Sequence, residues 1–299
     1  MKQAQRLLPR RSGSATIPSP LTPHHTTTAA ASRSAPRRTL HLLQHHHLKP
    51  SSPSSPPFIR YADADALQEE HRARFLAYKT SPATAAPPPQ LLTFQAQPTY
   101  TLGRRQDALS PAQAARLTQP LTIPSQPVAH YTPQVHKTNR GGLTTYHGPG
   151  QLVLWPVLDM HSPRHARFGV ASYAALLEAT TRALLADLWG IATYANPQEP
   201  GVWVARDGHE ERKIAALGVH HRRYVTALGV ALNVDVPTAG ADESVNPWAR
   251  FVPCGLAGKM VTSVAAETGS AEQAARWDME RLAEEWAARF EEGLLKGSV

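Results

Sequence analysis

The chain has 299 residues, of which 41% are hydrophobic and 18% charged, enough for one large domain or two small ones with a sizeable core. Its single cysteine excludes a disulfide scaffold and a cysteine-rich zinc module and indicates a reducing compartment, and no apolar run approaches the roughly 18 to 20 residues that a membrane-spanning helix needs. The net charge of +8 does not indicate a nucleic-acid-binding surface. Nine of the 31 Lys and Arg residues and none of the 23 acids lie within residues 1–60, which leaves 22 basic residues against 23 acidic ones.

Residues 1–60 predict a disordered basic leader and linker, followed by a single domain over residues 61–299. The leader is rich in Arg, Ser and Thr, and "MKQAQRLLPRRSG" and "RRTLHLLQHHHLK" mix cationic with apolar residues. This composition is typical of a mitochondrial transit peptide, whereas a secretory signal would need a continuous apolar stretch. A disordered tail with no targeting role is the alternative. The three histidines at 45–47 have no second set of ligands nearby in the sequence, so we predict no metal site there.

The first elements of the folded part are a helix and two extended segments. "DADALQEEHRARFLAYK" predicts a helix, because Leu67, His71 and Phe75 share one face. "LLTFQAQPTYTLGRR" predicts a strand, a turn and a second extended segment that ends at Gly103. Residues 106–134, rich in Pro and Gln, predict a surface loop or insertion with one short helix. "QLVLWPVLDM" is an apolar run of strand length.

The second half of the chain predicts helix, three strands and helix. "FGVASYAALLEATTRALLADLWG" predicts a helix that ends at Gly190. "GVWVARDGHEERKIAALGVHHRRYVTALGVALNV" predicts three strands, with turns at "RDGHEER" and near "HHRR". "SAEQAARWDMERLAEEWAARFEEGLL" predicts a last helix with a capping box at Ser270 and Gln273. Strands joined as hairpins and flanked by helices predict an α/β (α+β) domain with a mixed, mostly antiparallel sheet.

Three segments carry chemical signal. "RGGLTTYHGPGQLVLWP" (140–156) surrounds His147 with glycine and proline and can present a ligand site, or else forms a tight hairpin with a packed histidine. "KIAALGV" (213–219) begins an apolar strand with Lys213, which is either a solvated strand end or a buried amine that exchanges protons near neutral pH. In "PCGLAGKMVTS" (253–263), Cys254 lies between Pro and Gly. It is either a small core residue or a thiol exposed on a turn and activated by a nearby base.

Taken together, in this order and spacing, these segments resemble the lipoyl(octanoyl) transferases. "RGGLTTYHGPGQ" is similar to that family's RGG-x-x-T-[YF]-HGPGQ block, and "PTYTLGRR" is similar to its upstream segment. "KIAALGV", "ALNV" and "PCG" followed by "VTS" match its lysine strand, the strand after it and its cysteine stretch. The resemblance covers roughly residues 61–290.

The resemblance implies a fold like that of biotin and lipoate protein ligases and a catalytic pair of Cys254 and Lys213. The implied reaction moves an octanoyl group from acyl carrier protein to a lysine of lipoyl domains through a thioester on Cys254, without ATP, cofactor or metal. Backbone N–H groups at Gly141, Gly142 and after Cys254 are expected to bind the oxyanion. The expected substrate-binding residues are Arg140, Gly141, Gly142, Tyr146, His147, Gly148, Gly150, Leu217, Gly218, Gly229 and Ala231.

Further expectations concern the acyl chain and the partners. Leu143, Val153 and Leu217 are expected to line an apolar tunnel, and Arg104, Arg105 and Arg140 to contact the acidic carrier protein. The expected acceptors are lipoyl domains of 2-oxoacid dehydrogenases and the glycine cleavage H protein. We expect a monomeric enzyme of the mitochondrial matrix that binds no nucleic acid.

Two alternatives remain open: an ATP-dependent lipoate or biotin ligase, and a non-catalytic relative that binds carrier protein or lipoyl domains. Two positions depart from the family pattern. Leu228 stands before Gly229 where the family commonly has histidine, so no role of that histidine can be transferred. Trp155 replaces a more usual tyrosine, a conservative aromatic change.

Overall fold

The structure is a computed structural model that describes residues 42–50, 57–82, 85–123, 130–204, 211–251, 260–270 and 278–297. These residues belong to one unit of the chain, Arg37–Val299. No helix in these ranges is long and apolar enough to span a bilayer.

An eight-stranded sheet organises the unit, with neighbouring strands in the order β1-β2-β8-β12-β11-β10-β9 and β13 paired to β11. All of these pairs are antiparallel except β1 with β2 and β13 with β11. The predicted mixed, mostly antiparallel sheet is confirmed. The strands are β1 (Gln44–His47), β2 (Gln90–Phe94), β8 (Gln151–Val157), β9 (Tyr194–Ala195), β10 (Gly201–Val204), β11 (Arg212–Arg222), β12 (Val225–Asn233) and β13 (Met260–Val261).

The sequence of strand β8 is apolar without alternation because both of its faces are buried. Successive strand residues point to opposite faces of a sheet. Leu152 and Leu154 join the core on one face, while Val153 and Trp155 join the core on the other. Both faces of the sheet are therefore covered.

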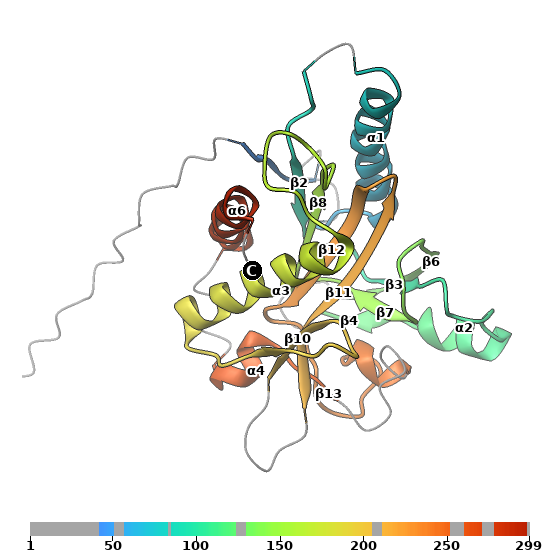
Figure 1. The fold of residues 1–299 in the computed structure, drawn as a ribbon. Helices are drawn as coiled ribbons and strands as arrows, with labels where there is room; N and C mark the ends of the chain where they lie inside the picture. The colour runs from blue at the N-terminus through green and yellow to red at the C-terminus, as the bar shows by residue number, and fades with distance from the viewer. Residues whose placement is uncertain are drawn as a thin grey trace, which may run out of the picture. The chain divides into compact units, whose positions relative to one another are not determined.

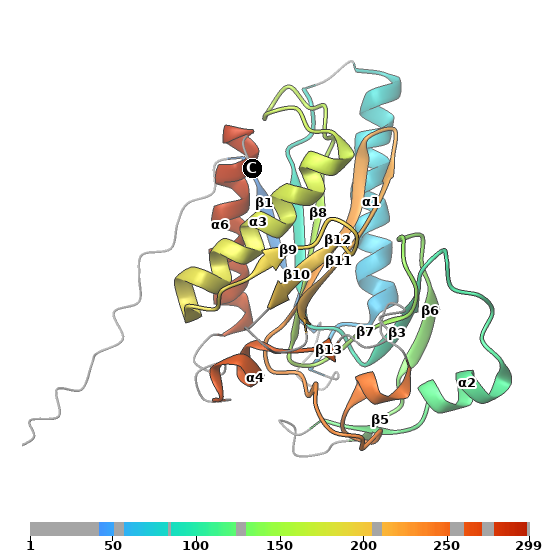
Figure 2. The ribbon, with the colours of Figure 1, turned by 60° about the horizontal axis from the view of Figure 1, so that its bottom comes forward.

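Helices cover the two faces unequally. Helices α3 (Val170–Trp189) and α6 (Met279–Lys296) lie together on one face, and α1 (Tyr61–Thr80) lies on the other, as Figures 1 and 2 show. Helix α3 ends at Gly190 in the left-handed conformation, as predicted, with φ 65°. The predicted capping box of the last helix lies partly outside the described residues, which show α6 beginning after Asp278.

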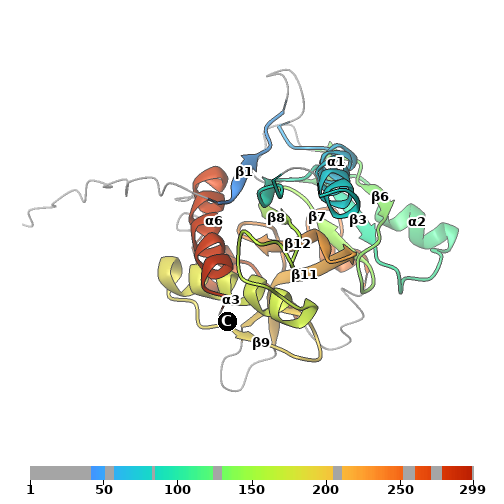
Figure 3. The same ribbon diagram turned by 45° about the horizontal axis from the view of Figure 1, so that its top comes forward.

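A smaller sheet lies beyond α1, with the order β6-β3-β7, as the view in Figure 3 shows. Its strands are β3 (Thr99–Leu102), β6 (Gln134–Lys137) and β7 (Thr145–His147). The segment between β3 and β6 contains the predicted short helix, α2 (Pro111–Leu117), and the paired strands β4 (Leu121–Thr122) and β5 (His130–Tyr131). The 3₁₀ helix η1 (Pro247–Arg250) and helix α4 (Val264–Thr268) follow β12 in the chain.

The predicted hairpin between β11 and β12 is confirmed. Arg222 pairs with Val225, so the turn consists of Arg223 and Tyr224, both with positive φ (51° and 65°). Positive φ at both central residues defines the type I′ turn that suits a two-residue hairpin. The predicted turn "RDGHEER" lies mostly outside the described residues.

One boundary differs from the prediction. Residues 44–47 were expected in the disordered leader, yet they form β1, which pairs with β2, and Leu43 is buried in the core. The sheet therefore extends to sequence before residue 61. Its histidines bond within the sheet: His45 and His47 to Thr93, and His46 to Gln90.

Candidate active site

A narrow pocket lies where the small sheet faces β11 and β12 of the large sheet. Its cavity measures about 40 Å³. An octanoyl chain could enter only if lining side chains moved, because this volume holds only a few water molecules. The described residues that line it are Tyr61, Arg140, Thr145, His147, Trp155, Lys213, Ala216, Leu217, Gly218, Leu228, Gly229, Val230 and Ala231.

Lys213 is buried at the pocket, with 7% of its surface exposed. Its Nζ lies 4.5 Å from the centre of the Trp203 ring and donates a hydrogen bond to the carbonyl oxygen of Pro200 at 3.2 Å. The sequence left open whether this lysine is solvated at a strand end, and the structure excludes that reading. These two contacts hold the amine against Pro200 and Trp203.

Arg140 is also buried, contrary to its expected role as a surface contact for the carrier protein. Its guanidinium donates to the carbonyl oxygen of Thr101 at 2.6 Å and to the hydroxyl of Thr101 at 3.0 Å. The stem of the side chain passes over Gly218, where a Cβ atom would lie 2.9 Å from Cδ of Arg140. Glycine at 218 is therefore needed for this arginine to reach the small sheet.

His147 is held by a chain of hydrogen bonds between buried side chains. Its Nδ1 lies 2.8 Å from Oε1 of Gln151. The amide nitrogen of Gln151 donates to Oδ1 of Asn233 at 2.9 Å, and the amide nitrogen of Asn233 donates to the carbonyl oxygen of Thr262 at 2.9 Å. The backbone N–H of Thr262 in turn donates to the carbonyl oxygen of Lys213 at 3.0 Å. The chain thus links the two pocket residues His147 and Lys213.

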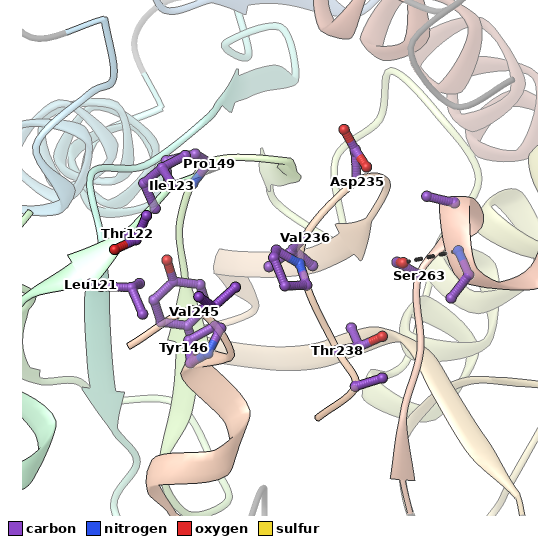
Figure 4. Close-up of a pocket in the computed structure, with 15 residues that line it drawn as sticks. Leu121, Thr122, Ile123, Tyr146, Pro149, Asp235, Val236, Thr238, Val245 and Ser263 are labelled. Atoms are coloured by element: carbon purple, nitrogen blue, oxygen red, sulfur yellow. Dashed lines mark hydrogen bonds between the residues drawn. The ribbon is translucent and has the colours of Figure 1, made fainter. Parts of the chain in front are cut away.

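Tyr146, the neighbour of His147, faces away from this pocket. Alternate residues of a strand point to opposite sides, and the Tyr146 ring packs against Tyr100 and Trp248. Burial raises the pKa of its phenol. Tyr146 lines a second cavity of about 490 Å³. In Figure 4, Leu121 and Tyr146 lie on one side of this cavity, and Thr238 and Ser263 on the other.

The second cavity is larger, but it lacks the chemistry of the first. Neither Lys213 nor His147 lines it. Among the described residues that line it, the one carboxylate is that of Asp235, whose pKa is raised by burial. We therefore place the candidate active site at the narrow pocket.

Seven of the predicted site residues meet at the narrow pocket and five others do not line it. Gly148 and Gly150 serve the turn between β7 and β8. A Cβ at Gly148 would overlap the Tyr146 hydroxyl, and Gly150 has φ 80° and packs against the backbone of Asp235. The residues brought together are Arg140, His147, Lys213, Leu217, Gly218, Gly229 and Ala231, and those elsewhere are Gly141, Gly142, Tyr146, Gly148 and Gly150.

The expected acyl tunnel is only partly reflected in the lining. Leu217 borders the pocket, but Val153 is fully buried in the core beside α1, and Leu143 lies outside the described lining. Sequence reasoning missed Tyr61, Trp155 and Leu228. The departures from the family pattern at Trp155 and Leu228 were the available signal, since both positions flank family motifs.

Cys254 lies outside the described residues, as does the rest of 252–259. The segment after it is described: β13 begins at Met260, and Val261 pairs with Lys213 of β11. No group of three or more His, Cys, Asp or Glu side chains suited to a metal ion occurs in the part of the chain that the structure describes.

Comparison with known proteins shows the family to which the chain belongs. The lipoyl protein ligase A/B catalytic domain family matches residues 73–291. A probable octanoyltransferase of Schizosaccharomyces pombe is 34% identical over 211 residues, which cover 69% of this chain and 81% of that protein. The Danio rerio protein named octanoyl-[acyl-carrier-protein]:protein N-octanoyltransferase LIPT2, mitochondrial, is 34% identical over 209 residues, which cover 70% of this chain and 79% of that one.

Among solved structures, a bipartite lipoate protein ligase of Thermoplasma acidophilum aligns with a TM-score of 0.48 at 14% identity, over 85% of this chain and 91% of that chain. From the extent of the family match and the identity to these relatives, the chain belongs to the lipoyl protein ligase A/B catalytic domain family and is an acyltransferase of its octanoyltransferase group.

Proposed function

We propose that this protein transfers the octanoyl group of octanoyl-acyl carrier protein to a lysine of lipoyl domains through a thioester on Cys254. The observation that carries the proposal is the meeting of Lys213, His147 and Arg140 at one buried pocket. The pairing of Val261 with Lys213 supports the role of Cys254, because β13 begins six residues after that cysteine.

The first half of the reaction forms the acyl-enzyme. The Lys213 amine takes the proton of the Cys254 thiol, since the thiolate is the nucleophile. The thiolate attacks the thioester carbonyl, the bond from the carbonyl carbon to the pantetheine sulfur breaks, and the proton passes from Lys213 to the departing thiolate. The octanoyl group is then held on Cys254.

The second half forms the product amide. The neutral amine of the acceptor lysine attacks the acyl carbon, and Lys213 takes one of its protons. The bond from carbon to the Cys254 sulfur breaks, and the sulfur regains a proton from Lys213. Conversion of a thioester to an amide is downhill, so no ATP is consumed. Backbone N–H groups at Gly141 and Gly142 and after Cys254 are our candidates for oxyanion contacts.

The partners and location follow from the same proposal. The acceptors are lipoyl domains of 2-oxoacid dehydrogenases and the glycine cleavage H protein, and the enzyme acts as a monomer. The Arabidopsis thaliana and Danio rerio relatives carry "mitochondrial" in their names, which supports a matrix location directed by the basic leader.

Intact mass spectrometry tests the proposal. Purified protein mixed with octanoyl-acyl carrier protein should gain one octanoyl group, and Cys254→Ser should gain none. On addition of a lipoyl domain without ATP, the octanoyl group should move to the domain. A requirement for ATP and free octanoate would identify a ligase instead, and binding without any acyl-enzyme would identify a non-catalytic relative.

A further inference from the structure

The hydrogen bonds around His147 fit only one position of its proton. A carbonyl oxygen can only accept, so the Asn233 amide nitrogen donates to Thr262 and leaves Oδ1 of Asn233 as an acceptor. The Gln151 amide nitrogen donates to that oxygen and, at 3.1 Å, to the carbonyl oxygen of Tyr146. Oε1 of Gln151 therefore faces His147, and Nδ1 of His147 must carry the proton that joins them.

The other ring nitrogen, Nε2, is consequently a hydrogen-bond acceptor. Burial lowers the pKa of His147 to about 4, and the charge of Arg140 acts in the same direction, so the ring is neutral near pH 7. The described residues supply no hydrogen-bond partner for Nε2. The side chain lines the pocket that also contains Lys213.

The remaining polar groups of the pocket favour a neutral amine over an ammonium ion. Arg140 and Lys213 can donate hydrogen bonds, and no Asp or Glu occurs among the described lining residues. An ammonium ion that entered beside a guanidinium would be disfavoured by like charge. A neutral primary amine can instead donate one N–H to Nε2 of His147.

We propose that Nε2 of His147 accepts a hydrogen bond from the attacking amine of the acceptor lysine and so directs its lone pair at the acyl carbon. This inference rests on the proposed octanoyl transfer and concerns its second half alone. The amine nitrogen bonds to the acyl carbon as the bond to the Cys254 sulfur breaks. One amine proton passes through Lys213 to that sulfur, and the other stays on the amide nitrogen, in the hydrogen bond to His147.

Two substitutions of His147 distinguish the role of Nδ1 from that of Nε2. His147→Asn keeps an N–H donor for Oε1 of Gln151 but has no group at the position of Nε2. His147→Gln can place an amide oxygen near that position. Both half-reactions are measured alone: octanoylation of Cys254 without a lipoyl domain, and single-turnover transfer from isolated acyl-enzyme to a lipoyl domain.

We expect His147→Asn to form acyl-enzyme within about threefold of the wild-type rate but to transfer the acyl group roughly 30-fold more slowly, the effect of one lost hydrogen bond to the reacting group. His147→Gln should recover about tenfold of that loss. Retained acylation shows that the variants fold. Equal slowing of both halves, or wild-type transfer by His147→Asn, would overturn the inference.

Gln151→Glu tests the assigned proton position. A carboxylate at 151 would still accept from Nδ1 but would favour the doubly protonated ring, in which Nε2 cannot accept. Other charged or titratable groups around the ring are Arg140, Lys213 and Tyr61, whose ring stacks on His147 at 5.4 Å and on His136 at 5.8 Å. None of these groups is altered.

The acid limb of the transfer rate should move up by at least about one pH unit in Gln151→Glu, while the pH profile of acylation stays unchanged. An unmoved transfer profile would overturn the assignment. A wild-type protein that shows no octanoyl mass on Cys254 would instead refute the proposed function, so the two failures are distinguishable.

Discussion

Lys213 shows how a strand can hold a buried amine in place. The side chain is almost fully buried, its stem lies beside Gly201, and its amine lies over the Trp203 ring. The amine is held between the Trp203 ring and the carbonyl oxygen of Pro200, to which it donates a hydrogen bond. The residue types around this lysine are therefore as important as the lysine itself.

Replacing Lys213 with Met should make acyl-enzyme formation depend on pH. Without the amine, only thiol that has ionised by itself can attack, and an ordinary cysteine ionises near pH 8.5. Acylation by Lys213→Met should be slower than wild type by about 100-fold at pH 7 and rise about tenfold per pH unit up to about pH 8.5. Stopped reactions analysed by intact mass give these rates. An unchanged rate at pH 7 would remove Lys213 from the mechanism.

Gly229 lies in a crowded part of the structure, and Gly141, which has open space around it, is its control. A Cβ at Gly229 would lie 2.3 Å from the carbonyl oxygen of Leu154 on the neighbouring strand, whereas a Cβ at Gly141 would contact nothing within 4 Å. Gly229→Ala should lower the free energy of unfolding by about 1–3 kcal/mol, and Gly141→Ala should change it by less than about 0.5 kcal/mol. Urea denaturation compares them. Similar losses in both would show that the contact at Gly229 is not the cause.

Strand β1 is an element that extends the domain into the basic N-terminal sequence. The Glu291 carboxylate of α6 accepts from the backbone N–H groups of Leu42 at 2.5 Å and Leu43 at 2.8 Å, and Lys49 pairs with Glu280 of the same helix. These contacts join β1 to a helix near the other end of the chain. A leader that is cut after import would have to be cut before Leu42 to leave them intact.

Two truncations test this element. A chain that begins at residue 37 keeps β1, whereas one that begins at residue 57 exposes the edge of β2 and leaves the buried Glu291 carboxylate without these donors. Hydrogen bonds to a charged group contribute about 1.5–3 kcal/mol, so the shorter chain should melt at least about 5 °C lower. Thermal unfolding followed by circular dichroism measures the difference. Equal midpoints would show that β1 contributes nothing to stability.

The same strand predicts a pH dependence of stability. Burial and the neighbouring histidines lower the pKa of His45 from 6.5 to about 4 in the folded state. As pH falls below about 6.5 the unfolded chain therefore binds a proton first, and the folded state loses stability until about pH 4. Between those values wild type should lose up to about 2 kcal/mol more than His45→Gln.

Denaturation at pH 7, 5.5 and 4 provides the comparison. Carboxyl groups with raised pKa values, such as those of Glu178 and Asp235, act in the opposite direction but are common to both proteins. Parallel curves for wild type and variant would contradict the assigned role of His45.

The segment between β3 and β6 is tied to the rest of the domain by one buried arginine. Arg250 of η1 donates to the carbonyl oxygens of Leu117 at 3.2 Å, Gln119 at 2.7 Å and Pro120 at 2.8 Å. Leu117 and Leu121 also join the core around Tyr146. The sequence predicts a surface loop or insertion here, and the described contacts show that the segment packs against the domain.

At the scale of the whole molecule, the site depends on two sheets. The small sheet carries His147 and the turn that begins at Arg140, and the large sheet carries Lys213 and Gly229. Exposed arginines lie next to that turn: the backbone N–H groups of Arg104 and Arg105 donate to the carbonyl oxygens of Arg140 and Gly142. A protein substrate that approaches the pocket from this side would meet their charges.

Reversal of these charges should weaken the use of an acidic carrier protein. In Arg104→Glu/Arg105→Glu, kcat/KM for octanoyl carrier protein should fall about tenfold at low salt, and kcat/KM for a small octanoyl thioester should change less than about twofold. Arg182→Glu, on α3 across the large sheet, is the control. Equal losses with both substrates would place the effect on the pocket and not on docking.

The sequence by itself determined the secondary structure and the family. Apolar runs of strand length, turn signals and helical spacing located the main elements from 61 onward, and Gly190 marked the end of α3, because these signals are local to the chain. Motif order predicted candidate site residues, seven of which line the narrow pocket. Gly218 and Gly229 were recognised from motifs, but the need for glycine at these positions comes from the side chain of Arg140 and the carbonyl oxygen of Leu154, which lie in other segments of the chain.

Only the tertiary structure decided what depends on contacts between distant segments. It separated Tyr146 from His147, buried Arg140 against Thr101, and added Tyr61 and Leu228 to the pocket. It also paired β1 with β2, although a short histidine run has little strand signal of its own. Such outcomes follow from burial and hydrogen bonding between residues that are far apart in the sequence, which no local pattern encodes.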